Sequence, residues 1–171
     1  MSEVSGIRPV QINRLGWLSY GLAATVIVLD QLSKLWILNV VDLPSRGQIP
    51  VLPFFNLTMV WNRGVSFGLL RAEVDLARWG LAAFSLIVAG ILAFWARNQE
   101  RRLSAIALGL IIGGAIGNLI DRVRFAAVAD FLDFSGLWFP WVFNIADCGV
   151  TVGITLFLLD SFVSGKAKAN A

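Results

Sequence analysis

The chain has 171 residues, of which 57 % are hydrophobic and only 15 % are charged, and its formal net charge is +3. A water-soluble domain of this length cannot bury so large an apolar fraction, so the composition excludes an ordinary globular protein and predicts a membrane protein. The sequence contains no histidine and a single cysteine, Cys148. It therefore excludes serine–histidine and cysteine–histidine nucleophiles, zinc sites built from cysteine and histidine, and intramolecular disulfides.

Four apolar stretches are long enough to cross a hydrocarbon core of about 30 Å. Because the first stretch is too long for a signal-peptide core and no small-x-small cleavage site follows it, we expect it to be retained as a membrane anchor. Tryptophans near the ends of the stretches suit the membrane interface. We predict a single polytopic domain over 1–171, with spans over about 17–38, 79–96, 103–120 and 141–163.

Lysine and arginine at the ends of the spans set the expected orientation. The densest short cluster contains Arg97, Arg101 and Arg102, so we place this turn in the cytoplasm. Both termini then face the cytoplasm, and the two longer connections face outward. The basic residues do not form a stripe along one face, so we expect them to contact membrane lipids and expect no nucleic-acid partner.

The outer connection over 39–78 is too long for a simple turn and contains a strand pattern. Prolines precede the pattern, Gly64 follows it, and apolar residues alternate within it: Phe55, Leu57, Met59 and Trp61. Alternation with period two predicts a half-buried strand. The expected fold class is an all-α membrane protein of four transmembrane helices, with a small extracytoplasmic β-sheet between the first and second helices.

Polar side chains inside a span are costly, so each is a candidate for function. Asp30 and Lys34 are four residues apart and can pair on one helix face, either to anchor the helix end or to serve a site. Small residues near the end of the third span predict close helix packing. Packing does not account for the nearby Asn118 and Asp121.

More polar residues occur between the third and fourth spans and at the start of the fourth. Asp130 lies in a short segment flanked by apolar residues, where an aspartate is most often solvated surface. Asn144 and Asp147 share one face of the fourth span. Carboxyl and amide groups thus gather at the outer membrane edge, where water and lipid meet: Asn62, Asn118, Asp121, Asp130, Asp133, Asn144 and Asp147.

Five blocks of sequence resemble bacterial lipoprotein signal peptidase, also called signal peptidase II, which is a family of aspartyl peptidases. The blocks are 30–34, 62–68, 113–122, 128–131 and 143–147, and with the four spans they cover nearly the whole chain. The chain departs from the family pattern at Ser66 and Cys148. Neither residue is an acid or base of the family's mechanism.

The resemblance implies removal of the signal peptide from prolipoproteins whose cysteine carries diacylglycerol, with the cut just before that cysteine. It also implies an inner-membrane location and inhibition by globomycin-type cyclic peptides. It places the two catalytic aspartates at Asp130 and Asp147. The implied supporting or substrate-binding residues are Asp30, Lys34, Asn62, Gly64, Asn118, Asp121, Arg122 and Asn144.

Two carboxyl groups suffice for peptide hydrolysis, because one ionised carboxylate can take a proton from water while a protonated one polarises the carbonyl group. Carboxyl groups held close together share a proton, and either aspartate can be the base in this scheme. No metal or other cofactor is expected. One chain carries every residue that the mechanism requires, so we expect a monomer.

Two other functions fit parts of the sequence. A proton-coupled transporter would use Asp30, Lys34 and Asp147 as a relay, but we would then expect polar residues throughout the membrane and an inverted repeat, and the second span carries no charge. A non-catalytic scaffold or lipid-binding subunit would explain the glycines and tryptophans. It would not explain why carboxyl groups gather at one membrane edge.

Overall fold

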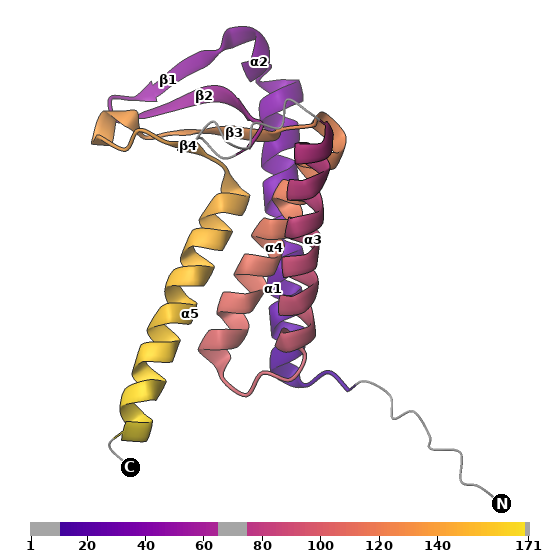
Figure 1. The fold of residues 1–171 in the computed structure, drawn as a ribbon. Helices are drawn as coiled ribbons and strands as arrows, with labels where there is room; N and C mark the ends of the chain where they lie inside the picture. Colours follow the sequence, from indigo (N-terminus) through magenta and orange to yellow (C-terminus); the bar gives the residue numbers. More distant parts are fainter. Residues whose placement is uncertain (1–10, 65–74, 170–171) are drawn as a thin grey trace, which may run out of the picture.

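The structure is a computed structural model, in which residues 11–64 and 75–169 are described. Four long helices stand side by side and a small antiparallel sheet lies across one end of them (Figure 1). All four are long and apolar enough to cross a membrane, which confirms the predicted fold class. They are α1 (Arg14–Leu35, continued by a π-helical turn, Trp36–Val40), α3 (Asp75–Ala96), α4 (Arg102–Phe125) and α5 (Ile145–Ala169).

Helix α4 contacts each of the other three long helices, and glycine makes the close approaches possible. A Cβ atom at Gly109 or Gly113 would lie 2.6 Å or 2.8 Å from a backbone oxygen of α1, so neither position accepts a side chain. A Cβ atom at Gly114 would collide with the backbone oxygen of Ala146 on α5. The small-residue packing predicted from the sequence is thereby confirmed.

Helix α3 lies against α4 at the edge of the bundle and presents its large side chains outward. Ala82, Ala89 and Ala96 form its buried stripe, while Phe84 and Phe94 are about two-thirds exposed. Exposed apolar side chains of this size match a lipid environment, because hydrocarbon solvates them as well as a protein interior does. The chain is therefore a multi-pass membrane protein.

The sheet has the strand order β1-β2-β3-β4, and every neighbouring pair is antiparallel. One of its faces packs on Ile37 and Leu43 at the end of α1 and in the short helix α2 (Leu43–Arg46). This matches the sheet with one apolar face that the sequence predicts. The strands are β1 (Gln48–Leu52), β2 (Phe55–Asn62), β3 (Val128–Asp133) and β4 (Val142–Phe143).

The sheet is larger than the sequence predicts, because the sequence pattern indicates strands in the connection over 39–78 alone. Two of the four strands come from the connection between α4 and α5. Asp130 therefore lies on a nearly fully buried strand and not on the solvated surface where a loop aspartate is most often found. The reason is tertiary: β3 is hydrogen-bonded to β2 on one side and to β4 on the other, and its two aspartates mask the strand pattern.

Helix ends also differ from the expected bounds in ways that matter for the site. Helix α4 continues to Phe125, so Asp121 and Arg122 lie within it. Helix α5 begins at Ile145, because the residues just before it form β4. Part of the connection over 39–78, namely 65–74, lies outside the described residues, and so does most of the block over 62–68.

Candidate active site

Asp130 and Asp147, the two aspartates implied as catalytic, meet at one amide side chain. Asp130 lies on β3 and Asp147 lies in the first turn of α5. The Nδ2 of Asn144 donates to Asp130 Oδ1 at 2.7 Å, and the Oδ1 of Asn144 accepts the backbone N–H of Asp147 at 2.9 Å. Asn62 Nδ2, at the end of β2, donates to the second oxygen of Asp130 at 3.1 Å. The fold therefore brings together residues that are far apart in the sequence.

Asn144 and Asp147 form a reciprocal cap at the start of α5. While the Asn144 side chain accepts from the Asp147 backbone, Asp147 Oδ2 accepts the Asn144 backbone N–H at 3.2 Å. This is the geometry of a capping box, which satisfies N–H groups that the helix itself leaves unpaired. The positive end of the helix dipole faces the same carboxyl group, so the position is suited to a negative charge.

Asp130 has a different environment from that of Asp147. Its side chain is 2 % exposed, and burial is the main cause that raises its pKa to about 7, with the neighbouring charge of Asp147 as the second cause. The hydrogen bonds from Asn62 and Asn144 act in the opposite direction but are outweighed. Asp130 therefore holds a proton over much of the range below neutral pH.

Asn118, on α4, holds Asp147 from the other side. Its Nδ2 donates to Asp147 Oδ1 at 2.7 Å. Its Oδ1 accepts from Asn144 Nδ2 at 3.1 Å and from Lys34 Nζ at 3.5 Å. Because two donors face the amide oxygen, the NH₂ group of Asn118 is fixed toward Asp147.

Lys34 lies behind these residues in a buried ion cluster. Its Nζ is 2.8 Å from Asp30 Oδ2, as the spacing of four predicts, and 2.7 Å from Asp121 Oδ2. All three side chains are at most 2 % exposed. A buried lysine with two carboxylates is stable only when the remaining lone pairs are also satisfied, and here backbone N–H groups of the site segments satisfy them.

Gly64 and Arg122 complete the implied set. Gly64 has φ +151°, a conformation that favours glycine, and its N–H donates to Asn62 Oδ1 at 3.1 Å, which turns the NH₂ group of Asn62 toward Asp130. Arg122 Nη1 donates to the carbonyl oxygen of Asn118 at 3.3 Å, and its charge acts on Asp130 and on the carboxyl groups beside it.

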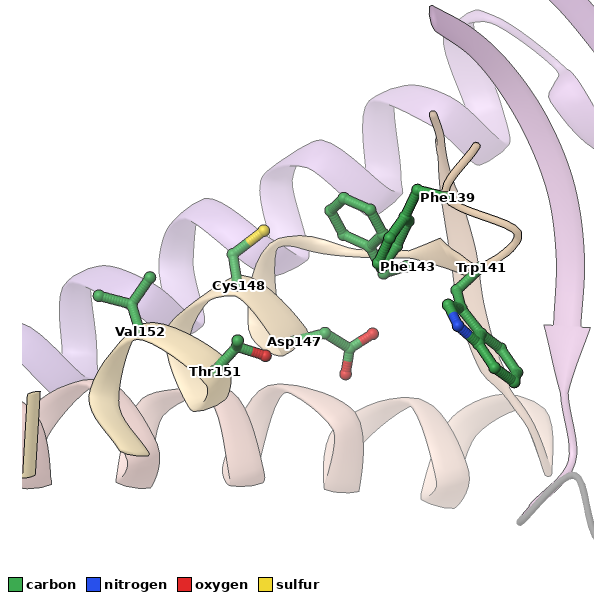
Figure 2. Close-up of a pocket in the computed structure, with 7 residues that line it drawn as sticks. All are labelled: Phe139, Trp141, Phe143, Asp147, Cys148, Thr151 and Val152. Carbon is green, nitrogen blue, oxygen red and sulfur yellow. The ribbon is translucent and has the colours of Figure 1, made fainter. Parts of the chain in front are cut away.

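An apolar pocket of about 280 Å³ opens beside Asp147. Figure 2 shows the Asp147 carboxyl group between the first turns of α5 and the ring of Trp141, with Phe139 and Phe143 nearby. A carboxyl group at the edge of an apolar pocket can act on a substrate that is itself partly apolar. The described lining is Phe139, Trp141, Phe143, Asp147, Cys148, Thr151 and Val152.

Two other aspartates lie away from this constellation. Asp133 accepts from Thr58 Oγ1 at 2.6 Å on the sheet, and this hydrogen bond is the main cause that lowers its pKa. Asp160 lies near the other end of α5, where Arg101 and Ser104 donate to it. Among the described residues, no group of three or more acidic or cysteine side chains is placed to hold a metal ion.

Sequence reasoning missed several contributors to the site. Gln31 lies within the block over 30–34, and the resemblance implies no role for it, although its amide contacts two of the buried carboxylates. Arg78 donates to the last carbonyl groups of α4, at Arg122 and Val123. The reciprocal cap could have been found, because Asn-x-x-Asp before an apolar run resembles a capping box.

Fold and site together define a class of protein: a four-helix membrane protein with paired carboxyl groups and an apolar pocket at one end of the bundle. The family model described as signal peptidase (SPase) II matches residues 22–163. The chain therefore belongs to the signal peptidase II family and is an aspartic-type peptidase of a bacterial membrane.

The relatives agree with this assignment over nearly the full length. A lipoprotein signal peptidase of Caulobacter vibrioides is 53 % identical, with 94 % of this chain and 96 % of that protein covered. One of Rhizorhabdus wittichii is 45 % identical, with 90 % and 91 % covered. Two solved structures of bacterial membrane enzymes superpose with TM-scores of 0.75 and 0.71, at 25 % and 29 % identity, and cover 92 % and 88 % of this chain and 94 % and 96 % of those chains.

Proposed function

We propose that this chain removes the signal peptide from prolipoproteins whose cysteine carries diacylglycerol, and that it cuts just before that cysteine. The observation that carries the proposal is that the Asn144 side chain donates to the Asp130 carboxyl group and accepts the backbone N–H of Asp147, at the edge of an apolar pocket. Such a site offers two carboxyl groups to a peptide bond and an apolar surface to the attached lipid. The relatives named lipoprotein signal peptidase support the same substrate class.

In the proposed reaction Asp147 is the base and Asp130 is the acid. Asp147 lies at a helix N-terminus in a reciprocal cap, which suits an ionised carboxylate. Asp130 is buried, and its pKa, which is raised to about 7, keeps it mostly protonated below neutral pH. Two groups whose environments differ in this direction divide the acid and base roles between them.

The proton transfers then balance. Asp147 takes a proton from the attacking water, whose oxygen forms the new bond to the scissile carbonyl carbon. Asp130 gives its proton to the carbonyl oxygen as charge develops there. When the tetrahedral intermediate collapses, the C–N bond breaks and the proton held by Asp147 passes to the leaving nitrogen. The carbonyl re-forms and returns its proton to Asp130, so both aspartates end as they began.

The apolar pocket is the proposed site of the diacylglyceryl part of the substrate, and β2 is the proposed guide for the peptide. Asn62 at the end of β2 already donates to Asp130, so a peptide lying along this strand would reach the aspartates. Cys148, the single cysteine, lines the pocket and can report its occupation.

Alkylation of that cysteine tests the pocket. We expect a diacylglyceryl-modified prolipoprotein, or globomycin as a competing inhibitor, to slow labelling of Cys148 by a small maleimide several-fold. A Cys148→Ser variant gives the background. The proposed pocket would have to be abandoned if labelling ran at the same rate with and without a saturating amount of either compound.

The proposed orientation places both termini in the cytoplasm, the sheet at the outer face and the protein in the bacterial inner membrane, as a monomer. The arginine cluster at the turn between α3 and α4 supports this, because it lies at the end of the bundle opposite the sheet (Figure 1). Reporters active in one compartment only, fused to the C-terminus and inserted at the β3–β4 turn, test it. Activity on the same side from both would contradict it.

Cleavage by variants tests the central claim. We expect purified parent enzyme to cleave a diacylglyceryl-modified prolipoprotein, and Asp130→Asn and Asp147→Asn to lose at least about 10³-fold in kcat. Asp133→Asn is the matched control, because it neutralises an aspartate on the same strand that is bonded to Thr58 instead. It should stay within a few-fold of the parent. Retained activity in either of the first two variants would remove that residue from the mechanism.

A further inference from the structure

A buried hydrogen-bonded group lies directly behind the two proposed catalytic aspartates. It consists of Asp30, Gln31 and Lys34 on α1 and Asp121 on α4, and is called the support cluster below. Lys34 bridges the two carboxylates at 2.8 Å and 2.7 Å. Asp30, Lys34 and Asp121 are at most 2 % exposed, so water contributes little to holding their charges in place.

Each carboxylate of the support cluster also holds one backbone N–H of the catalytic segments. Asp121 Oδ2 accepts the N–H of Ala129 at 3.1 Å, and Asp30 Oδ1 accepts the N–H of Ala146 at 3.0 Å. Ala129 immediately precedes Asp130, and Ala146 immediately precedes Asp147. The separation of the two support carboxylates therefore sets the separation of the two catalytic segments.

Lys34 cannot fix that separation alone, because it touches one oxygen of each carboxylate and two negative charges repel each other around it. Gln31 supplies the second connection. Its Nε2 donates to Asp30 Oδ2 at 3.1 Å, to Asp121 Oδ1 at 3.1 Å and to the carbonyl oxygen of Gly117 at 3.3 Å. Its Oε1 accepts from Arg124 at 3.4 Å, which fixes which end of the amide faces the carboxylates.

We infer that Gln31 is a positioning residue of the peptidase, which acts by holding Asp30 and Asp121 at the spacing that aligns Asp130 with Asp147. This inference rests on the proposed function, because it gives Gln31 a role in the same reaction. Gln31 itself contacts neither catalytic carboxyl group in the described structure; it works through two carboxylates and two backbone N–H groups. Misplacement of catalytic groups by about 1 Å can cost as much as 10²-fold in rate, so a small movement of this support is sufficient.

Replacement of the amide by an apolar side chain of similar length tests the inference. We expect Gln31→Met to lower kcat by about 10- to 100-fold while KM stays within about threefold, because the substrate surfaces are untouched. Gln99→Met is the matched control: Gln99 is a buried glutamine that also donates to a helix carbonyl, at 3.2 Å, but it lies at the far end of the bundle. Its kcat should stay within about twofold of the parent.

A second variant provides a signature that a purely structural role would not give. In Gln31→Glu the protonated carboxyl group can still donate a hydrogen bond, whereas the ionised group repels Asp30 and Asp121 and is attracted by Lys34 and Arg124. We expect the ratio of its kcat to that of the parent to rise as the pH is lowered from 8 to 5.5. Loss of stability alone would leave this ratio constant in samples that remain folded.

The inference is overturned if Gln31→Met keeps kcat within twofold of the parent, or if Gln31→Met and Gln99→Met lose kcat equally with equal losses of melting temperature. A flat pH ratio for Gln31→Glu overturns it as well. The aspartate variants distinguish these outcomes from failure of the proposed function, because full activity of Asp147→Asn would show that the reaction does not use the pair that Gln31 is proposed to align.

Discussion

An ion cluster lies near each end of helix α4, and the two clusters differ in burial and in what they hold. Near its beginning, Arg101 and Ser104 both donate to Asp160 of α5. Near its end, Asp121 shares Lys34 with Asp30 of α1. Both clusters join neighbouring helices through a carboxylate and a cation, so composition alone would rank them equally as candidate sites.

The two clusters differ in the further hydrogen-bond partners of their carboxylates. The contacts described for Asp160 with Arg101 and Ser104, called the lower cluster below, join the start of α4 to α5, and the arginine side chain is 43 % exposed. The carboxylates of the support cluster continue to Ala129 and Ala146, which carry the proposed catalytic aspartates. A buried charged group therefore indicates a functional role only when its remaining hydrogen bonds are traced to the residues that it positions.

Replacing the cation of each cluster should give the largest difference in kcat and stability between the two clusters. Lys34→Met leaves two buried carboxylates without their shared partner, and breaking a buried ion pair in this way costs about 3–5 kcal/mol. We expect a clear fall in melting temperature and a loss of at least about 10²-fold in kcat in the remaining folded enzyme. Arg101→Met should keep kcat within about threefold and lose less stability. Equal losses of kcat in the two variants would erase the distinction.

A methyl group placed between α1, α4 and α5 should have the next largest effect. A Cβ atom at Gly117 would lie 2.7 Å from Asp30 Oδ2 and 3.1 Å from the Cβ of Ala146, so Gly117→Ala must displace one of them. We expect kcat to fall by about 10-fold or more. Gly90→Ala on α3 is the control, because within the described structure its Cβ meets nothing within 4 Å and alanine favours a helix by up to about 1 kcal/mol. Normal turnover by Gly117→Ala would show that the support cluster tolerates such a shift.

The pH dependence should sharpen the assignment of acid and base. The pKa of Asp130 is raised from 3.8 to about 7, so the required proton is present below pH 7 and is lost as the pH rises through that value. We expect kcat to decline above about pH 7, and Asp133→Asn to show the same decline. Because the folded state binds this proton more tightly than the unfolded state, this group also lowers stability as the pH rises from about 4 to about 7. A rate that increased steadily up to pH 9 would contradict the assignment.

The smallest effect is expected in the lower cluster. Ser104→Ala removes one hydrogen bond to Asp160 while Arg101 remains, which should cost about 1–2 kcal/mol. The melting temperature should therefore drop by a few degrees, and kcat and KM should match those of the parent. A change in kcat comparable with that of the Lys34 variant would mean that the lower cluster also reaches the site.

Local patterns in the sequence account for much of this architecture. Long apolar runs indicate the four spans, and alternation indicates β2. The spacing of Asp30 and Lys34 indicates an ion pair, and the structure places Lys34 Nζ 2.8 Å from Asp30 Oδ2. The family resemblance, carried by five short blocks, was confirmed by the family model and the relatives. Each of these signals depends on residues close together in the chain.

What the sequence could not supply depends on residues that are distant in the chain. Strand β3 is stabilised by neighbours on both sides, and its aspartates conceal it from any local rule. The sharing of Lys34 with Asp121 and the two contacts of Gln31 with carboxylates depend on how α1 and α4 are aligned along their axes. The apolar pocket beside Asp147 likewise needs the β3–β4 hairpin to fold back over α5.

The antiparallel pairing of β2 with β3 has a consequence for the biosynthesis of the protein. Asn62 and Asp130 are 68 residues apart, and Asp30 and Ala146 are 116 residues apart, so both contacts join early and late portions of the polypeptide. Long-range contacts of this kind form after the local ones, because their loop-closure entropy is paid first. A ribosome-bound chain that has been synthesised only to the end of α4 therefore contains Asn62 and Asn118 but neither proposed catalytic carboxyl group. We therefore expect protease activity only after α5, which carries Asp147, has been synthesised.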